Sequence, residues 1–323
     1  LSYTRVKGGD FLYFRVIWKW IGPALLIPYF MTLFWGGDWN GTWSEMVLDS
    51  QRLEAFHSSD GDETAASVEF HKSWGRVYLD KEEKHYVDGE TYLIGVVVCQ
   101  MDPQCEMEAL KAQAVLGRTF LYKKMDRDGK VNQSELGISL DRQSQLEEIW
   151  GKDGFTIAYE RVKQAVEETA GQILTYEGVP VEPFFHKISA GVTRAGEEPY
   201  LVSVESKQDM EAEGYEAVRE WKEETYGEIQ MISRDEAGYV EEIQIGGQVY
   251  TGDEAMELLQ LPSPAFTISH LEGGRVEAVC HGVGHGIGLS QYGAEKLAEE
   301  GYGAEAILGY YFKNVEVISL DRV

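Results

Sequence analysis

One stretch decides how this chain is interpreted: His281-Gly282-Val283-Gly284-His285-Gly286-Ile287-Gly288-Leu289-Ser290-Gln291-Tyr292-Gly293-Ala294. Four glycines alternate with two histidines and two aliphatic residues, and a Ser-Gln-Tyr run follows at once. Glycine costs about 1 kcal/mol in a helix interior and is kept where the backbone bends sharply or approaches a ligand. We therefore interpret the stretch as a loop that lines a ligand site. We expect a helix after it, with Ser290 as N-cap, Leu297 at an apolar position and an end near Gly301.

Two other interpretations of this stretch stay open. His281 and His285 are four residues apart, which on a helix would place both rings on one face, as in zinc proteases. The Gly-Val-Gly between them disfavours a helix, and no Glu follows the first His to act as a base. The stretch could also be a tightly packed segment whose histidines are only hydrogen-bonded.

The chain is strongly acidic, with a formal net charge of −26 over 323 residues. This excess argues against nucleic acid as a partner, because that affinity depends on Lys and Arg meeting phosphates. It also argues against binding flat on an anionic membrane surface. Many of the acids lie between Glu205 and Glu228 at helix-like spacing, and we expect an exposed helix there. The spacing is not that of a calcium loop.

The N-terminal region predicts a membrane anchor. Trp20 to Gly37 contains no charged residue, and aromatic residues cluster towards its two ends. A helix of this length, at about 1.5 Å per residue, approaches the hydrocarbon thickness of a bilayer. Basic residues precede it and acidic residues follow, which places the N-terminus in the cytoplasm. We predict a cytoplasmic segment (1–16), a transmembrane helix (17–37), a linker (38–65) and an extracytoplasmic domain (66–323) of a single-pass cell-membrane protein. A cleaved signal peptide is the alternative, although no small-x-small cleavage site follows the apolar run.

The three cysteines, Cys99, Cys105 and Cys280, do not form a disulfide framework. A Cys99–Cys105 bridge and two buried thiols are both compatible with the sequence. There is no Cys-x-x-Cys motif to indicate a cysteine-based zinc site.

Local patterns predict both helices and strands. The stripe of Met107, Leu110, Ala114 and Leu121 predicts a helix over 106–125, whereas 92–101 fits either a helix face or a strand. The remaining expectations are a strand over 68–79, a helix over 157–169, hairpins turning at Glu177-Gly178 and Gly246-Gly247, a short helix over 253–259, a strand over 265–280 and two final helices around 301–303. Because strands and helices do not alternate regularly, we predict an α+β fold in a single mixed helix and sheet domain.

Four blocks follow one another along the chain. They are Tyr92–Met101 running into Glu108–Ala114 and Arg118–Phe120; Thr169–Tyr176; Phe185-His186-Lys187-Ile188-Ser189-Ala190-Gly191-Val192-Thr193; and the glycine-rich stretch continuing to Tyr310-Tyr311. Together they resemble the stage II sporulation protein D / LytB family. The third block is similar to that family's Phe-His-Ser-Thr-Ser-Gly-Gly-x-Thr stretch. The resemblance runs from about Val68 to the C-terminus.

The resemblance implies action on cell-wall peptidoglycan during forespore engulfment. Such lytic transglycosylases cleave the β-1,4 bond after N-acetylmuramic acid in denuded glycan strands and close a 1,6-anhydro ring without water. One carboxylic acid protonates the glycosidic oxygen and then takes the proton from the sugar's 6-hydroxyl group. The resemblance also suggests other engulfment-stage membrane proteins and an amidase as partners.

The chain departs from the family at the acid. Where the family motif reads Glu-Met-Pro, this sequence reads Gln100-Met101-Asp102-Pro103, and the spacing of eight to Glu108 matches without a gap. Gln100 therefore occupies the catalytic position, where it can donate a hydrogen bond but cannot transfer a proton. Losing general acid–base catalysis typically costs about 10²–10⁴-fold in rate. Asp102 is the candidate substitute.

The resemblance also implies a glycan-binding groove. The predicted substrate-binding residues are Arg118, His186, Ser189, Gly191, Thr193, Gly284, His285, Gly286, Ser290, Gln291 and Tyr292. Some family members bind zinc near the third block through His and Cys; only His186 is present here, so we predict no metal and no other cofactor. Two functions stay open: an active or residually active lytic transglycosylase, and a non-catalytic module that grips glycan or recruits other hydrolases. A metalloenzyme built on His281 and His285 is the third and least supported hypothesis.

Overall fold

The computed structural model describes residues 74–79, 84–137 and 142–320. The predicted anchor (17–37) and linker (38–65) lie outside these residues, as does the first half of the strand expected over 68–79; the second half contains the strand β1 (Arg76–Tyr78). In the described ranges, no helix is both long and apolar enough to cross a membrane.

A buried helix, α4 (Gly89–Gln100), organises the N-terminal half. Asp88 caps it by accepting a 2.7 Å hydrogen bond from the Glu90 N–H. The valine-rich segment that fits either a helix or a strand is thus a helix, and nearly all of its side chains are buried. Because burial surrounds the helix, packing outweighs the modest strand preference of its β-branched residues. A small sheet lies at its start, with β1 (Arg76–Tyr78) between β2 (Tyr86–Asp88) and β3 (Lys130–Asn132).

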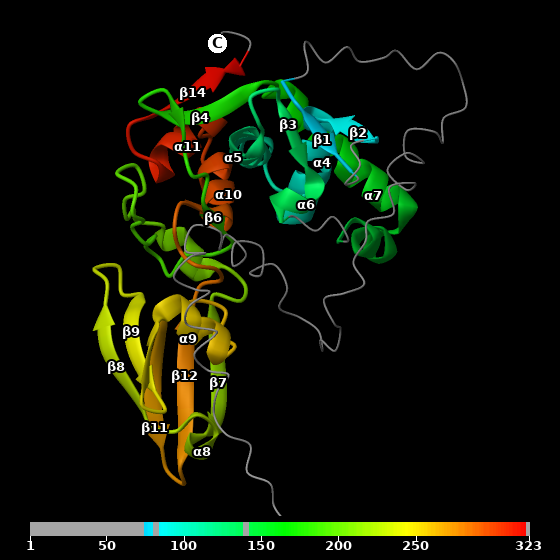
Figure 1. Cartoon of the computed structure of the whole chain (residues 1–323). Helices are drawn as coiled ribbons and strands as arrows, with labels where there is room; N and C mark the ends of the chain where they lie inside the picture. The colour runs from blue at the N-terminus through cyan, green and yellow to red at the C-terminus, as the bar shows by residue number, and fades with distance from the viewer. Residues whose placement is uncertain (1–73, 80–83, 138–141, 321–323) are drawn as a thin grey trace, which may run out of the picture.

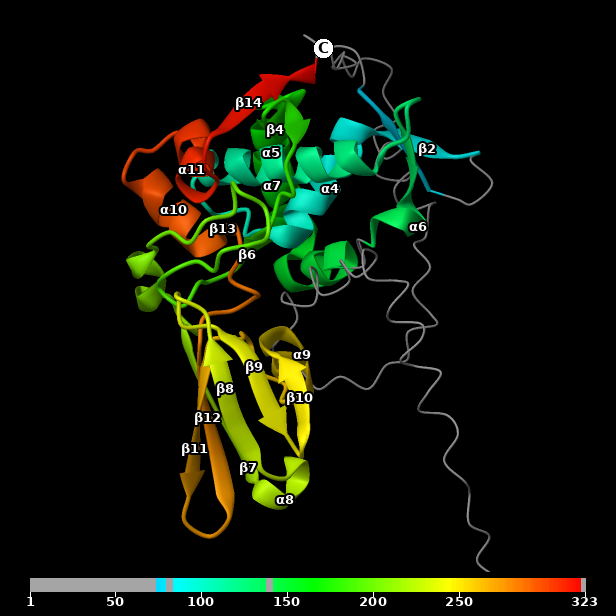
Figure 2. The ribbon, with the colours of Figure 1, turned by 60° about the vertical axis from the view of Figure 1, so that its left-hand side comes forward.

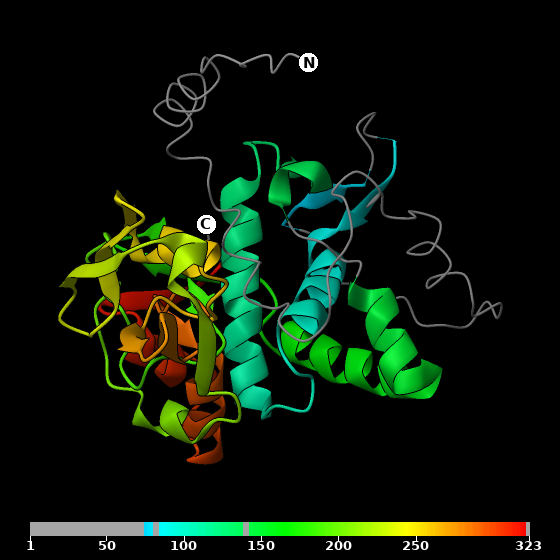
Figure 3. The ribbon, with the colours of Figure 1, turned by 90° about the horizontal axis from the view of Figure 1, so that it is seen from below.

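The central helix is α5 (Met107–Lys124), which confirms the helix predicted over 106–125. Figure 3 shows it between the pair α4 and α7 on one side and the C-terminal half of the chain on the other. The long helix α7 (Arg142–Glu168) is kinked at Gly151, whose φ of 71° is not helical. The short α6 (Gln133–Leu136) precedes it. The helix expected over 157–169 is the second part of α7.

The C-terminal half completes this larger core. β4 (Gln172–Tyr176) pairs with β5 (Val179–Pro180) and with β14 (Val315–Ser319). The predicted hairpin turn is confirmed, with φ of 51° at Glu177 and 79° at Gly178. Two helices, α10 (Gln291–Glu299) and α11 (Ala304–Tyr311), pack on α5 as the two expected final helices.

A second, smaller hydrophobic core lies in a region made mostly of strands, below the larger helices (Figure 1, Figure 2). Its two sheets have the orders β10-β9-β8 and β11-β12-β7. The strands are β7 (Glu216–Lys222), β8 (Ile229–Arg234), β9 (Val240–Ile245), β10 (Gln248–Thr251), β11 (Phe266–Leu271) and β12 (Arg275–His281), with the short helices α8 (Glu223–Tyr226) and α9 (Gly252–Leu258). The hairpin at Gly246-Gly247 and the helix over 253–259 are confirmed, and a Thr251–Glu254 capping box starts α9. The segment over 265–280 is a hairpin of β11 and β12.

The prediction of an exposed helix between Glu205 and Glu228 is wrong. The chain forms a short 3-10 helix, η1 (Lys207–Glu211), and then β7, which pairs with β12 along its whole length; only the four residues of α8 at its end are α-helical. Glu216 and Glu220 are four residues apart, a spacing that fits one face of a helix and is also a multiple of the strand period of two. Pairing with β12, which is distant in sequence, decides in favour of the strand.

The mixed helix and sheet composition confirms the α+β class. The thiols of Cys99, Cys105 and Cys280 are not joined by any disulfide in the described part of the chain. Of the two alternatives for Cys99 and Cys105, the structure therefore has thiols, with Cys99 buried and Cys105 half-buried.

Candidate functional site

The glycine-rich stretch lies against the third sequence block. β13 (Leu289–Ser290) runs parallel to β6 (Phe185–His186), Val283 pairs with Ile188, and Ile287 pairs with Arg194. Backbone hydrogen bonds connect the two segments, including Arg194 N–H to the Gly286 carbonyl (2.7 Å) and Tyr292 N–H to the Lys187 carbonyl (3.1 Å). The third and fourth sequence blocks are therefore one structural unit.

Glycine is required at Gly286 for two reasons. Its φ of +81° is a left-handed conformation, and a Cβ there would lie 2.5 Å from the ring of Tyr239. Tyr239 cannot move aside easily, because it is fully buried and its hydroxyl accepts from the Ala190 N–H and donates to the Val192 carbonyl. The stretch thus packs tightly as well as turning.

Gly286→Ala should destabilise the protein by more than Gly273→Ala. Gly273 has nearly the same φ, +78°, but among the described residues a methyl group there meets no atom within 4 Å. Both changes incur a left-handed backbone cost of roughly 1–2 kcal/mol, and only Gly286→Ala adds overpacking of about 1–3 kcal/mol. Urea unfolding of both variants measures the difference. Equal losses would show that the contact with Tyr239 is not tight.

The stretch leads directly into a buried glutamine cluster. Ser290 caps α10 as predicted, accepting from the Gly293 N–H, and Gln291 begins the helix. The Nε2 of Gln291 donates to the Gln100 backbone carbonyl (3.0 Å) and to Oε1 of Gln113 (3.3 Å). The Nε2 of Gln113 in turn donates to Oε1 of Gln100 (3.0 Å). Blocks one and four therefore meet at Gln100.

Gln113 is not among the site residues predicted from the sequence. Its position on α5, three residues after the buried Leu110, places a polar side chain on the apolar face, and that was the available signal. Buried polar groups need hydrogen-bond partners, so such a residue indicates a buried polar network.

Asp102, the candidate substitute acid, lies in a different environment. It is exposed, and its Oδ1 accepts from the Gln104 N–H (2.9 Å) in a local turn. General acid catalysis at neutral pH favours a partly apolar setting, which an exposed turn does not provide.

The two histidines of the site are held neutral. His186 is buried and lies against His285, with ring centroids 5.9 Å apart. Burial lowers the pKa of His186 to about 3 and that of His285 to about 4. Nδ1 of His186 contacts the Ile287 carbonyl, and Nδ1 of His285 accepts from the Ile287 N–H. Both rings thus fix the glycine-rich stretch.

The third block owes its shape to a carboxylate that the sequence analysis missed. Asp209, in η1, is fully buried, and its Oδ2 accepts from the Ser189 N–H (2.7 Å). Burial raises the pKa of Asp209. The hydroxyl oxygen of Ser189 accepts from the Gly191 N–H, and that of Thr193 from the Val204 N–H. The predicted binding residues Ser189 and Thr193 are therefore buried and stabilise the loop through hydrogen bonds to its backbone. Asp209 was missed because it lies in a run of acidic residues that the sequence analysis assigned to an exposed helix.

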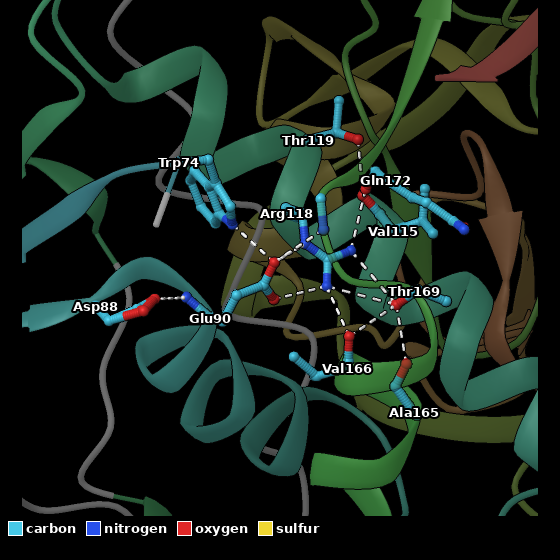
Figure 4. Close-up of polar contacts among 11 residues, drawn as sticks. Trp74, Asp88, Glu90, Val115, Arg118, Thr119, Ala165, Val166, Thr169 and Gln172 are labelled. Atoms are coloured by element: carbon cyan, nitrogen blue, oxygen red, sulfur yellow. Dashed lines mark hydrogen bonds and ion pairs between the residues drawn. The ribbon is translucent and has the colours of Figure 1, made fainter. Parts of the chain in front are cut away.

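Arg118 lies elsewhere. Its guanidinium is fully buried and forms a bidentate ion pair with Glu90 (2.7 and 2.8 Å), together with hydrogen bonds to the carbonyls of Val166 and Gln172 (Figure 4). Glu90 also accepts from Trp74 and from the Gly171 N–H. The structure thus places Arg118 at the junction of α4, α5, α7 and β4, a structural position apart from the predicted binding residues.

Tyr292 is the predicted binding residue with an accessible aromatic ring. It is half-buried at the start of α10, with the Lys296 ammonium 5.4 Å from its ring centroid. Gly191, Gly284 and Ser290 are buried. A surface hollow of about 630 Å³ lies away from these residues, between the start of α5 and the start of α11, and is lined by Glu108, Lys111, Glu168 and Ala304 among others.

His281 and His285 have different neighbours. The His281 ring stacks on Tyr215 with centroids 5.1 Å apart, and its Nε2 lies 3.3 Å from Glu216. In the described part of the chain, no group of three or more His, Cys, Asp or Glu side chains is arranged to hold a metal ion.

Taken together, the third block pairs with the glycine-rich stretch, and Gln291, which follows that stretch, joins Gln113 and Gln100 in a buried amide cluster. A Stage II sporulation protein family model matches residues 80–176. The chain is similar to stage II sporulation protein D of Bacillus amyloliquefaciens, with 33% identity over 72% of this chain and 74% of that relative. The corresponding protein of Bacillus subtilis is 30% identical over 72% of this chain and 75% of the relative. An uncharacterized Brachyspira hyodysenteriae protein is 27% identical over 72% of this chain and 67% of its own length.

The matches place the chain in a family of sporulation proteins. The chain belongs to the stage II sporulation protein D family.

Proposed function

We propose that this protein binds denuded peptidoglycan glycan strands during engulfment and cleaves them poorly or not at all. We further propose that residues 17–37 anchor it in the cell membrane with the rest of the chain outside. The observation that carries the proposal is that Gln113 and Gln291 hold Gln100 in a buried hydrogen-bonded cluster. The family resemblance assigns the position of this amide to the catalytic acid.

The arrangement around Gln100 supports binding rather than proton transfer. An amide can donate to or accept from a sugar oxygen, but it cannot supply or remove the proton that cleavage needs. The other carboxyl group near it in sequence, Asp102, is exposed and engaged in a turn. The same surface could recruit the engulfment-stage membrane proteins and the amidase that the family resemblance suggests as partners.

Tyr292→Ala should weaken binding to insoluble denuded glycan strands. The ring is half-buried and belongs to the residue that follows Gln291. Losing an aromatic contact worth about 1 kcal/mol weakens binding roughly fivefold. Co-sedimentation of the full chain, solubilised in mild detergent, measures the effect. Tyr302→Ala removes an exposed tyrosine from the turn between α10 and α11 and serves as control. Equal retention of both variants would contradict the placement of the binding surface.

A further inference from the structure

We infer that Gln113 and Gln291 fix the Gln100 carboxamide in one orientation, with its oxygen turned inward and its nitrogen presented to the ligand. The acid position is then a permanent hydrogen-bond donor to an acceptor oxygen of the glycan, either a glycosidic oxygen or an acetamido carbonyl. This inference rests on the proposed function and names two positioning residues for it.

The orientation of each amide follows from a backbone anchor. The carbonyl of Gln100 can only accept, so the group 3.0 Å from it must be the nitrogen of Gln291. The same nitrogen lies 3.3 Å from Gln113, which must therefore present its oxygen. The nitrogen of Gln113 then points to Gln100, 3.0 Å away, and finds the oxygen of that side chain. Reversing any one amide would bring two oxygens or two nitrogens together.

Burial makes this order costly to disturb. Gln100 is 4% exposed, Gln113 0% and Gln291 6%. A buried donor or acceptor that loses its partner loses its hydrogen bond without regaining one from water, so the cluster strongly favours a single arrangement.

The nitrogen of Gln100 is the free end of the cluster. Among the described residues no hydrogen-bond partner for this Nε2 is found, and it is not one of the sequestered polar atoms that lack a partner. It is therefore the donor of the cluster that is left for a ligand. A protonated carboxyl group at this position would also donate a hydrogen bond to the glycan oxygen, but it could then transfer its proton to that oxygen. The amide of Gln100 donates the hydrogen bond and transfers no proton.

Gln113→Glu tests the inference by reversing the cluster. At high pH the new carboxylate has no proton to donate, so Gln100 must turn its nitrogen inward and its oxygen to the ligand. We expect at least about tenfold weaker binding of denuded glycan strands at pH ~8. As the pH falls towards ~5, protonation of the buried carboxyl restores the donor, and binding should recover. Gln113→Met, of similar size, cannot titrate and should show a smaller, pH-independent loss.

Wild-type protein measured over the same pH range is the reference. Binding by Gln113→Glu that equals wild type at high pH, or that does not recover at low pH while Gln113→Met is folded, would overturn the inference. NMR of the side-chain amides tests the orientation of Gln100 without relying on glycan binding. The Gln100 amide signals, assigned by their absence in Gln100→Glu, should exchange with solvent faster than those of Gln113. If wild type fails to bind glycan, the proposed function falls; slow exchange at Gln100 overturns the orientation itself.

Discussion

Gln100→Glu should raise the release of anhydro-muropeptides from denuded glycan strands by at least about 10²-fold over wild type. The two side chains are nearly isosteric, so the new carboxyl occupies the place now held by the amide. Val96, Val97 and Met101 are buried around this end of α4, and burial raises the pKa of a carboxyl, as general acid catalysis requires. Gln113 would donate to the carboxylate and oppose that rise in part. Mass spectrometry of the soluble products measures the release.

Asp102→Asn is the control for this prediction. It should leave the products of both wild type and Gln100→Glu unchanged, because Asp102 lies exposed in a turn. Wild-type turnover that equals that of Gln100→Glu and disappears in Asp102→Asn would identify Asp102 as the acid. The binding-only account would then be wrong.

Arg118→Met should destabilise the protein by about 3–5 kcal/mol, because it leaves the Glu90 carboxylate buried without its cation. Arg118 is 0% exposed and Glu90 3%. Arg275→Met makes the same chemical change in an ion pair that is 55% and 44% exposed, with Glu220, and should cost no more than about 1 kcal/mol. Urea unfolding of the two variants gives both values.

Similar losses in the two arginine variants would contradict the structural role of Arg118. Should Arg118→Met be too unstable to purify, Arg118→Lys keeps the charge but loses the bidentate geometry, and a clear destabilisation is still expected. Arg275→Lys should show none.

Local signals predicted much of the fold. Paired left-handed residues at Glu177-Gly178 and Gly246-Gly247 mark hairpins, and the apolar stripe of Leu110, Ala114 and Leu121 marks α5, because each pattern is complete within a few residues. β7 was mistaken for a helix because its structure depends on β12, more than fifty residues later.

The sequence indicated which segments form the site better than it indicated which partners their side chains contact. The glycine-rich stretch and the third block were found from sequence, but nothing in a sequence says that Arg118 turns to Glu90, twenty-eight residues earlier. Gln113 and Asp209 were missed for the same reason. Their roles come from the partners that the fold brings to them, Gln100 and Ser189.

The most direct test of the central claim is to incubate the wild-type chain with denuded glycan strands and assay binding and cleavage on the same sample. The account predicts that the protein sediments with the strands, while anhydro-muramyl ends form at least about 10²-fold more slowly than with Gln100→Glu. Protein that stays in the supernatant, or strands cut as fast as by Gln100→Glu, would contradict it.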